Sequence, residues 1–276
     1  MGHNKAVAAT FIVALLWSLA GFLIKSIHMT PFALTSGKCL LTAVFLIPVV
    51  HSIHGFKIDR YVILGSFFYA AFTYCFNIST KLTVSAIAIV MQYTAPIYVA
   101  LLSNIFLKEK ITRADIYELI FVCLGMVLFF LDKITGGSFL GNVISIFNGV
   151  TFAGLAICFR LQKNQSPIAS VFLGNLLGAI IGFPALVSNG MPDYSSLIYL
   201  TLFAGQAAFT FTLYSEASKY LSGLETVLLP IFDPILNPVW VYLFLGEKIG
   251  FMSICGMIIV LLSISLRVVY GLKCVK

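Results

Sequence analysis

The chain contains a succession of apolar segments, each about as long as a helix must be to cross a lipid bilayer. In a helix, about 20 apolar residues span a hydrocarbon core roughly 30 Å thick. The predicted spans are 6–25, 32–50, 61–80, 84–107, 114–131, 140–161, 168–187, 194–215, 222–245 and 250–270. Only 10% of the residues are charged and 60% are hydrophobic, which is too little polar surface for a soluble fold of 276 residues. The sequence therefore predicts an all-α integral membrane protein with ten transmembrane helices.

The basic residues lie mostly between the apolar segments, and their distribution predicts an orientation. If the ten spans alternate in direction, 12 of the 17 lysine and arginine residues fall on one side of the membrane and the other five on the opposite side. Cytoplasmic connections carry the excess of positive charge. We therefore expect a multi-pass protein of the cytoplasmic membrane with both termini in the cytoplasm. The net charge of +7 is explained in this way without a nucleic-acid partner.

An internal repeat divides the chain into two halves. Residues 81–111 align with residues 219–249 without a gap, at an offset of 138 residues. Both copies carry a proline at the same position and the triplet Glu-Lys-Ile near the end. We predict two repeats, 1–138 and 139–276, that together form one transport unit. Because each half would hold five spans, the second half enters the membrane inverted, as in secondary transporters whose site lies near the midplane.

Three stretches carry a resemblance to a known family. The sequence resembles the two EamA repeats of the drug/metabolite transporter superfamily at ALLWSLAGFLIK, QYTAPIYVALLSNIFLKEKIT and LLPIFDPILNPVWVYLFLGEKI. The resemblance implies ten helices, alternating access and the movement of small metabolites, often amino acids outward. Similar proteins commonly carry Glu-Pro where this chain has Asp233 and Pro234. Many also carry a basic residue at the position of Lys38.

A carboxylate, Asp233, lies in the middle of the ninth predicted span. Three prolines surround it at every fourth position (Pro230, Pro234 and Pro238), so they share one face and leave carbonyl groups there without donors. A buried acid is costly in a membrane and is expected to face the bundle interior, a water-filled cavity or a cation. We predict that Asp233 and the neighbouring Asn237 belong to a transport pathway. The alternative is a neutral acid that ties neighbouring helices together.

Lys38 lies about two turns inside the second predicted span, at a depth within several ångströms of Asp233. A Lys38–Asp233 pair would keep the carboxylate ionised, whereas without that pair the carboxyl group could exchange protons. The alternative is that Lys38 extends to the outer headgroups. No cofactor is expected, and coupling to protons or another ion is an open alternative.

Polar and aromatic residues elsewhere could line the same cavity. Gln92, Tyr93 and Thr94 precede the proline of the first copy and approach the midplane from the opposite direction. Tyr69 and Asn148 are further candidates for the lining. The residues that we predict to bind substrate are Asp233, Asn237, Lys38, Gln92, Tyr93, Trp17, Tyr74, Asn77 and Gln206.

Enzyme motifs are missing from the sequence. It contains no HExxH, GxGxxG or GxxxxGK[ST], and its six cysteines include no CxxC pair, so neither catalysis nor a metal site is expected. We predict a secondary transporter that moves a small molecule through the lipid bilayer, with efflux of an amino acid or related metabolite favoured. One alternative is uptake of an organic cation such as a quaternary amine, which aromatic faces beside one acid would suit. Another is a non-transporting intramembrane protein.

A row of small residues bears on the oligomeric state. Gly174, Gly178 and Gly182 share one stripe of the seventh predicted span, where two helix backbones could approach closely. The partner helix is expected either within the same chain or in a second protomer. Monomer and homodimer are therefore both open.

Overall fold

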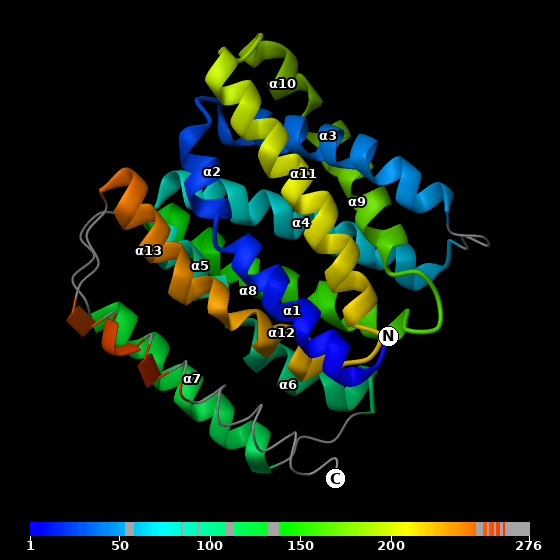
Figure 1. The fold of residues 1–276 in the computed structure, drawn as a ribbon, viewed down its shortest axis with the longest axis vertical. Coiled ribbons are helices and arrows are strands. Elements are labelled where there is room, and N and C mark those ends of the chain that lie inside the picture. Colours follow the sequence, from blue (N-terminus) through cyan, green and yellow to red (C-terminus); the bar gives the residue numbers. More distant parts are fainter. Residues whose placement is uncertain are drawn as a thin grey trace.

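The computed structural model consists of helices joined by short connections (Figure 1). It describes residues 1–52, 58–83, 85–92, 94–108, 113–131 and 138–246, with a few isolated positions between 251 and 262. In chain order the elements are α1 (His3–Trp17), α2 (Ala20–Ser26), α3 (Pro31–His51), α4 (Arg60–Leu82), α5 (Ser85–Gln92), α6 (Ala95–Phe106), α7 (Arg113–Leu131), α8 (Phe139–Leu161), α9 (Ile168–Ile181), α10 (Phe183–Asn189), α11 (Tyr194–Ala217), α12 (Gly223–Leu228), the short 3-10 helix η1 (Leu229–Phe232) and α13 (Asp233–Leu245). Within the described ranges every regular element is helical, as predicted.

Six helical segments of the described chain are long and apolar enough to cross a membrane. They are His3–Ser26, Pro31–His51, Arg60–Leu82, Phe139–Leu161, Tyr194–Ala217 and Gly223–Phe244. The pair α9 and α10, bent by 54° at its break, can form a seventh. Helices α5 to α7 cover the predicted spans 84–107 and 114–131, whereas the predicted span 250–270 lies largely outside the described residues. The protein is thus an all-helical multi-pass membrane protein, and its count of ten spans stays a prediction.

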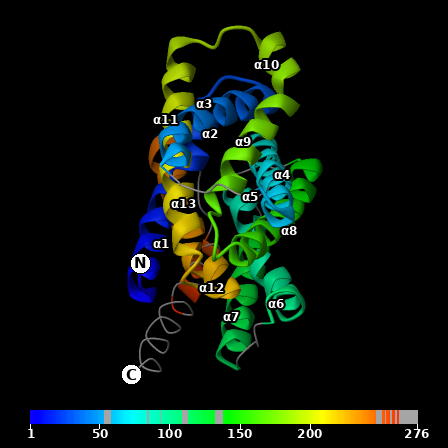
Figure 2. The same cartoon turned by 90° about the vertical axis from the view of Figure 1, so that its right-hand side faces the viewer.

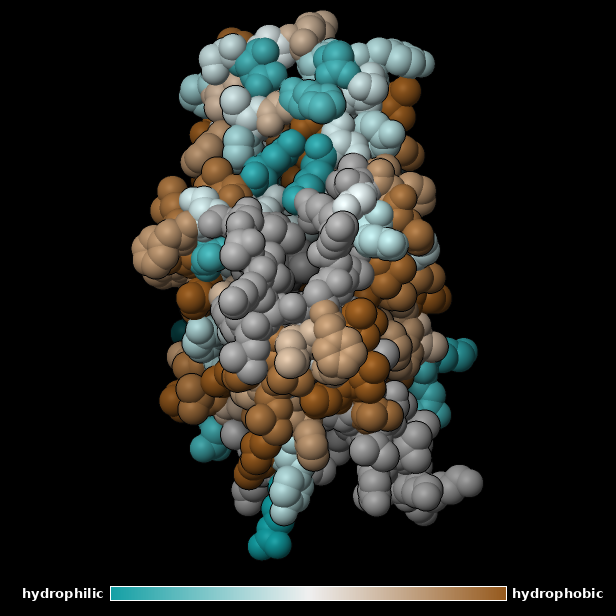
Figure 3. Space-filling view, turned by 90° about the vertical axis from the view of Figure 1, so that its left-hand side faces the viewer, coloured by the Kyte–Doolittle hydropathy of each residue, from teal (hydrophilic) through white to brown (hydrophobic). Residues whose placement is uncertain are grey.

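The outer surface of the helices is largely apolar. Figure 3 shows hydrophobic side chains over much of the middle of the molecule and hydrophilic ones gathered toward its upper end. Large side chains such as Leu101, Ile105 and Phe209 are more than half exposed. A patch of this extent is unfavourable in water but suits contact with lipid chains.

Polar side chains fix where several helices begin. The Asp59 carboxylate accepts hydrogen bonds from two backbone N–H groups in the first turn of α4, at 2.8 and 2.9 Å. Asp193 caps α11 by accepting from the Ser196 N–H at 3.1 Å. Hydrogen bonds from Ser195 and Ser196 hold the pKa of the Asp193 carboxyl below its ordinary value. These caps satisfy N–H groups that have no partner within their own helix.

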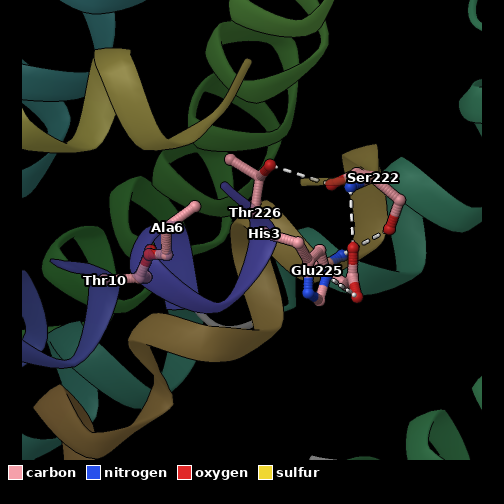
Figure 4. A network of polar contacts seen from close by, with 6 residues as sticks. All are labelled: His3, Ala6, Thr10, Ser222, Glu225 and Thr226. Atoms are coloured by element: carbon pink, nitrogen blue, oxygen red, sulfur yellow. Dashed lines mark hydrogen bonds and ion pairs between the residues drawn. The ribbon is translucent and has the colours of Figure 1, made fainter. Parts of the chain in front are cut away.

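The start of α12 is fixed by a capping box that also meets α1 (Figure 4). The Ser222 hydroxyl accepts from the Glu225 N–H at 3.2 Å, and the Glu225 carboxylate accepts from the Ser222 N–H at 2.8 Å. His3 Nε2 lies 3.2 Å from Glu225 Oε1. The beginnings of α1 and α12 are thereby joined, at the end of the bundle opposite the α10–α11 connection (Figures 1 and 2).

Helix α9 packs against α3 and α4 along its row of glycines. A Cβ atom at Gly174 would lie 2.8 Å from the Ser66 carbonyl oxygen, and one at Gly178 would lie 2.9 Å from the Cys39 Sγ atom. At Gly182 a Cβ atom would be as close to the backbone of α3. The small residues therefore serve contacts within this chain.

Two helical segments break at equivalent positions of the repeat. Helix α6 begins at Ala95 and α13 begins at Asp233, which are separated by the repeat offset of 138 residues. In the second copy the break is the tight turn of η1, which contains Pro230. Because proline has no N–H, the Thr226 carbonyl lacks its usual donor, and the Tyr214 hydroxyl donates to it instead at 2.9 Å.

Candidate functional site

A cavity of about 450 Å³ lies inside the bundle. Its wall takes residues from α1, α2, α3, α4 and α5 of the first half of the chain and from α11 and α13 of the second. The volume falls within the range of about 300–1,000 Å³ that is typical of small-molecule sites. Six of the nine residues predicted to bind substrate line it, namely Trp17, Lys38, Asn77, Gln92, Gln206 and Asp233.

Lys38 provides a positive group in this wall. Its side chain is only 2% exposed, which contradicts an extension to the outer headgroups. The Nζ atom donates to the Tyr69 hydroxyl at 3.3 Å and lies 5.4 and 5.7 Å from the centroids of the Tyr69 and Phe203 rings. Helix α3 packs against α4, α9 and α11, so the ammonium is held inside the bundle.

Asp233 provides a negative group in the same wall. It is 2% exposed and is the first residue of α13. The N-terminal end of a helix carries a partial positive charge, so this position favours a carboxylate. The chain turns here because η1 ends just before Asp233 and Pro234 starts the new helix. A half-helix that ends at membrane depth can thus present a charge to the cavity.

Three amide side chains add hydrogen-bonding groups to the wall. Asn77 is fully buried, and its Nδ2 donates to a hydroxyl of α3 at 3.0 Å. Its Oδ1 accepts no hydrogen bond from the described residues. Gln92 Oε1 accepts from Asn148 at 2.9 Å, and Gln206 donates to the Leu16 carbonyl. The Asn77 oxygen is therefore an acceptor that a solute in the cavity could use.

The apolar part of the wall consists of side chains that the sequence analysis did not single out. Phe72 and Phe76 lie on α4, and Phe203, Ala207 and Phe211 lie on α11. Each set is spaced by four residues, so its members share one face of the helix. This spacing is the signal that could have identified them. It is hidden in the sequence because apolar residues also cover the lipid-facing sides of the same helices.

Asn237 lies beside the break between α1 and α2. Its Nδ2 donates to the Ser18 carbonyl at 2.7 Å, and Trp240 Nε1 donates to the Ser18 hydroxyl at 2.9 Å. Gln206 meets the Leu16 carbonyl of the same break. These side chains satisfy backbone groups that an interrupted helix would otherwise leave without partners in the bilayer.

Two other predicted residues are not among the cavity-lining side chains. The Tyr74 hydroxyl donates to the Gly178 carbonyl at 2.8 Å, so it joins α4 to α9. Thr73 and Asn77, one turn apart on α4, line the cavity, and Tyr74 is turned from Thr73 by about 100° around the helix. Tyr93 lies outside the described residues.

Comparison with known families identifies the chain. Residues 4–131 and 139–269 each match the EamA-like transporter family, and together they cover most of the sequence. The chain belongs to the EamA-like transporter family. The resemblance to EamA repeats is therefore confirmed.

This EamA-family chain also has similar individual proteins. It is 24% identical over 284 residues to a Bacillus subtilis (strain 168) protein named "Uncharacterized transporter YxxF", covering 96% of this chain and 90% of that protein. A solved crystal structure of a protein matches with a TM-score of 0.75 and 16% identity, covering 94% of this chain and 96% of that one. The second likeness shows a shared fold alone. The family and the first relative indicate a membrane transporter rather than an enzyme.

Proposed function

We propose that this EamA-family protein is a secondary transporter that exports an amino acid or a related metabolite through the internal cavity. The observation that carries the proposal is the composition of one buried wall, which holds a lysine, a carboxylate and aromatic rings. An amino acid presents an ammonium group, a carboxylate and a side chain. Each of these parts has a complementary group in the cavity.

Alternating access is the mechanism that this architecture favours. The wall draws on helices of both halves, so a small movement of one half against the other would open the cavity toward one side of the membrane at a time. The broken helices supply polar groups at a depth where a continuous helix offers none. We place the protein in the cytoplasmic membrane with both termini in the cytoplasm, on the basis of its positive charges.

Asp233 is our candidate for the group that makes transport sensitive to protons or another cation. It is a buried carboxylate on the cavity wall, where uptake of a proton would change the charge that a solute meets. This scheme needs no cofactor. An imposed pH gradient that leaves the flux unchanged would argue for facilitated diffusion.

Transport of an organic cation is the second candidate. The aromatic rings of Trp17, Phe72, Phe76, Phe203 and Phe211 line the cavity, and such faces attract quaternary amines. The buried Lys38 in the same wall opposes a solute that carries only positive charge. We therefore favour the amino acid.

Filling the cavity tests the proposal. Ala207 is 4% exposed and lines the cavity, so Ala207→Phe would occupy space that a solute needs. Leu202→Phe introduces the same ring on α11 at a lipid-facing position that is 56% exposed. In vesicles loaded with labelled amino acids, we expect Ala207→Phe to lower efflux at least about 10-fold. Leu202→Phe should leave efflux within about twofold.

Two results would contradict this function. The first is that vesicles containing the unsubstituted protein keep every amino-acid gradient intact. The second is that Ala207→Phe, shown to be folded and inserted, transports as fast as Leu202→Phe.

A further inference from the structure

Lys38 places a positive charge at an apolar depth of the bundle. It is the eighth residue of α3, about 10 Å from the start of that helix, and is 2% exposed. An ammonium group in such surroundings is unfavourable unless hydrogen bonds and an opposite charge compensate for its lost hydration. The contacts of Lys38 therefore indicate what is still needed at this position.

The described groups in direct contact with the Lys38 ammonium are neutral. Nζ donates to the Tyr69 hydroxyl at 3.3 Å, and the rings of Tyr69 and Phe203 lie beside it at 5.4 and 5.7 Å. An ammonium group has three N–H donors, and Tyr69 accepts from one of them. The aromatic faces stabilise the cation without accepting conventional hydrogen bonds. Donors thus remain for a ligand in the cavity that Lys38 lines.

The charges of the cavity wall determine which solute fits electrostatically. Lys38 and Asp233 are the charged residues among its described lining, so their formal charges cancel. A solute that carries only a positive charge would leave the buried site with an uncompensated charge. A solute with one positive and one negative group would leave the site neutral.

We propose that Lys38 binds the substrate carboxylate and so restricts transport to solutes that carry one carboxylate together with an ammonium group. This inference rests on the proposed transport function and specifies its substrate class. The carboxylate accepts hydrogen bonds from Nζ, while Asp233 and the Asn77 oxygen face the cationic end of the solute. A phosphate dianion fits less well, because Lys38 is the single basic residue of the described wall.

Matched ligand pairs test this assignment. The purified full-length protein is titrated with each standard L-amino acid and with the corresponding carboxamide, which keeps the ammonium group and the side chain but removes the carboxylate charge. Glycine betaine and choline form a second pair, in which a quaternary ammonium is present with and without a carboxylate. We expect at least one carboxylate to bind about 10- to 100-fold more tightly than its uncharged partner, as loss of a charge-assisted hydrogen bond implies.

Substitutions at Lys38 separate binding from folding. Lys38→Met keeps the length of the side chain without its charge and should reduce the preference for the carboxylate to less than about threefold. Lys38→Arg keeps the charge and should retain a preference. Lys219→Met is the matched control, because Lys219 pairs with Glu216 at 2.6 Å, away from the cavity wall. It should bind like the unsubstituted protein.

Three results would overturn the assignment. They are equal binding of acids and carboxamides, a preference that survives in Lys38→Met, and no binding of any carboxylate in the panel. If Lys38→Met does not fold, the ligand pairs on the unsubstituted protein decide the matter. If vesicles transport choline or a carboxamide and Ala207→Phe blocks that flux, the cavity still transports and only the role of Lys38 is rejected.

Discussion

At the scale of single residues, the site depends on two opposite charges buried in one wall. Lys38 and Asp233 are each 2% exposed and come from different halves of the chain. Buried charges lower stability unless other charges or hydrogen bonds compensate for their desolvation. Tyr69 compensates in part for Lys38, and the N-terminus of α13 does so for Asp233. A solute with both charges would complete the compensation.

Neutralising Asp233 should impair transport. We expect Asp233→Asn to lower amino-acid flux in vesicles at least about 10-fold, because the cavity then carries the uncompensated charge of Lys38 and loses an acceptor for the ammonium group. Asp233→Glu keeps the charge and should retain more activity than Asp233→Asn. Asp193→Asn is the control, since asparagine also caps helices and Asp193 lies outside the cavity wall. Unchanged flux in Asp233→Asn would remove the proposed role of this acid.

The sequence could indicate the polar residues of the cavity but not its apolar ones. A charge or amide inside an apolar segment is unfavourable toward lipid, so Lys38, Asn77 and Asp233 could be assigned to the interior. Phe72 and Phe211 could not, because phenylalanine is equally suited to lipid and to an internal wall. Asn237 was assigned to the interior for the same reason as the others, but the sequence could not show that it caps the α1–α2 break.

At the scale of elements, proline explained one kind of break and missed another. Pro96 and Pro234 lie at the first turns of α6 and α13, where a missing N–H costs nothing. The break between α1 and α2, after Trp17, contains no proline or glycine. It is stabilised by side chains of α11 and α13, including Gln206 and Asn237. Such long-range contacts cannot be read from the local sequence.

The glycines of α9 allow a test of close helix packing. Gly174→Ala should destabilise the protein by about 1–3 kcal/mol, because the new Cβ would lie 2.8 Å from the Ser66 carbonyl oxygen of α4. Gly205→Ala on α11 is the matched control, since its Cβ would meet its nearest neighbour, Phe45, at 3.8 Å. That change should be neutral or slightly stabilising. Unfolding in detergent measures both, and equal stability of the two variants would contradict the packing described here.

At the scale of the whole molecule, the repeat could be predicted because it left a register in the sequence. The starts of α6 and α13 keep the offset of 138 residues. The division at residue 138 and the inverted orientation of the halves stay predictions. The helix ends could be predicted only approximately, because the bend of 54° between α9 and α10 divides what the sequence predicts as one continuous span.

The predicted orientation can be tested by cysteine labelling on either side of the bent pair α9 and α10. If the pair crosses the membrane once, Asn164 before α9 and Met191 after α10 lie on opposite sides. Both residues are exposed, Met191 almost completely at 99%. The excess of positive charge places Asn164 in the cytoplasm. In intact cells, a membrane-impermeant maleimide should therefore label Met191→Cys, and Asn164→Cys only after permeabilisation, each measured against the unsubstituted protein. The reverse pattern would invert the orientation. Labelling of both positions from one side would mean that α9 and α10 form a re-entrant pair, which would leave the second half with an even number of crossings and remove the physical basis for an inverted repeat.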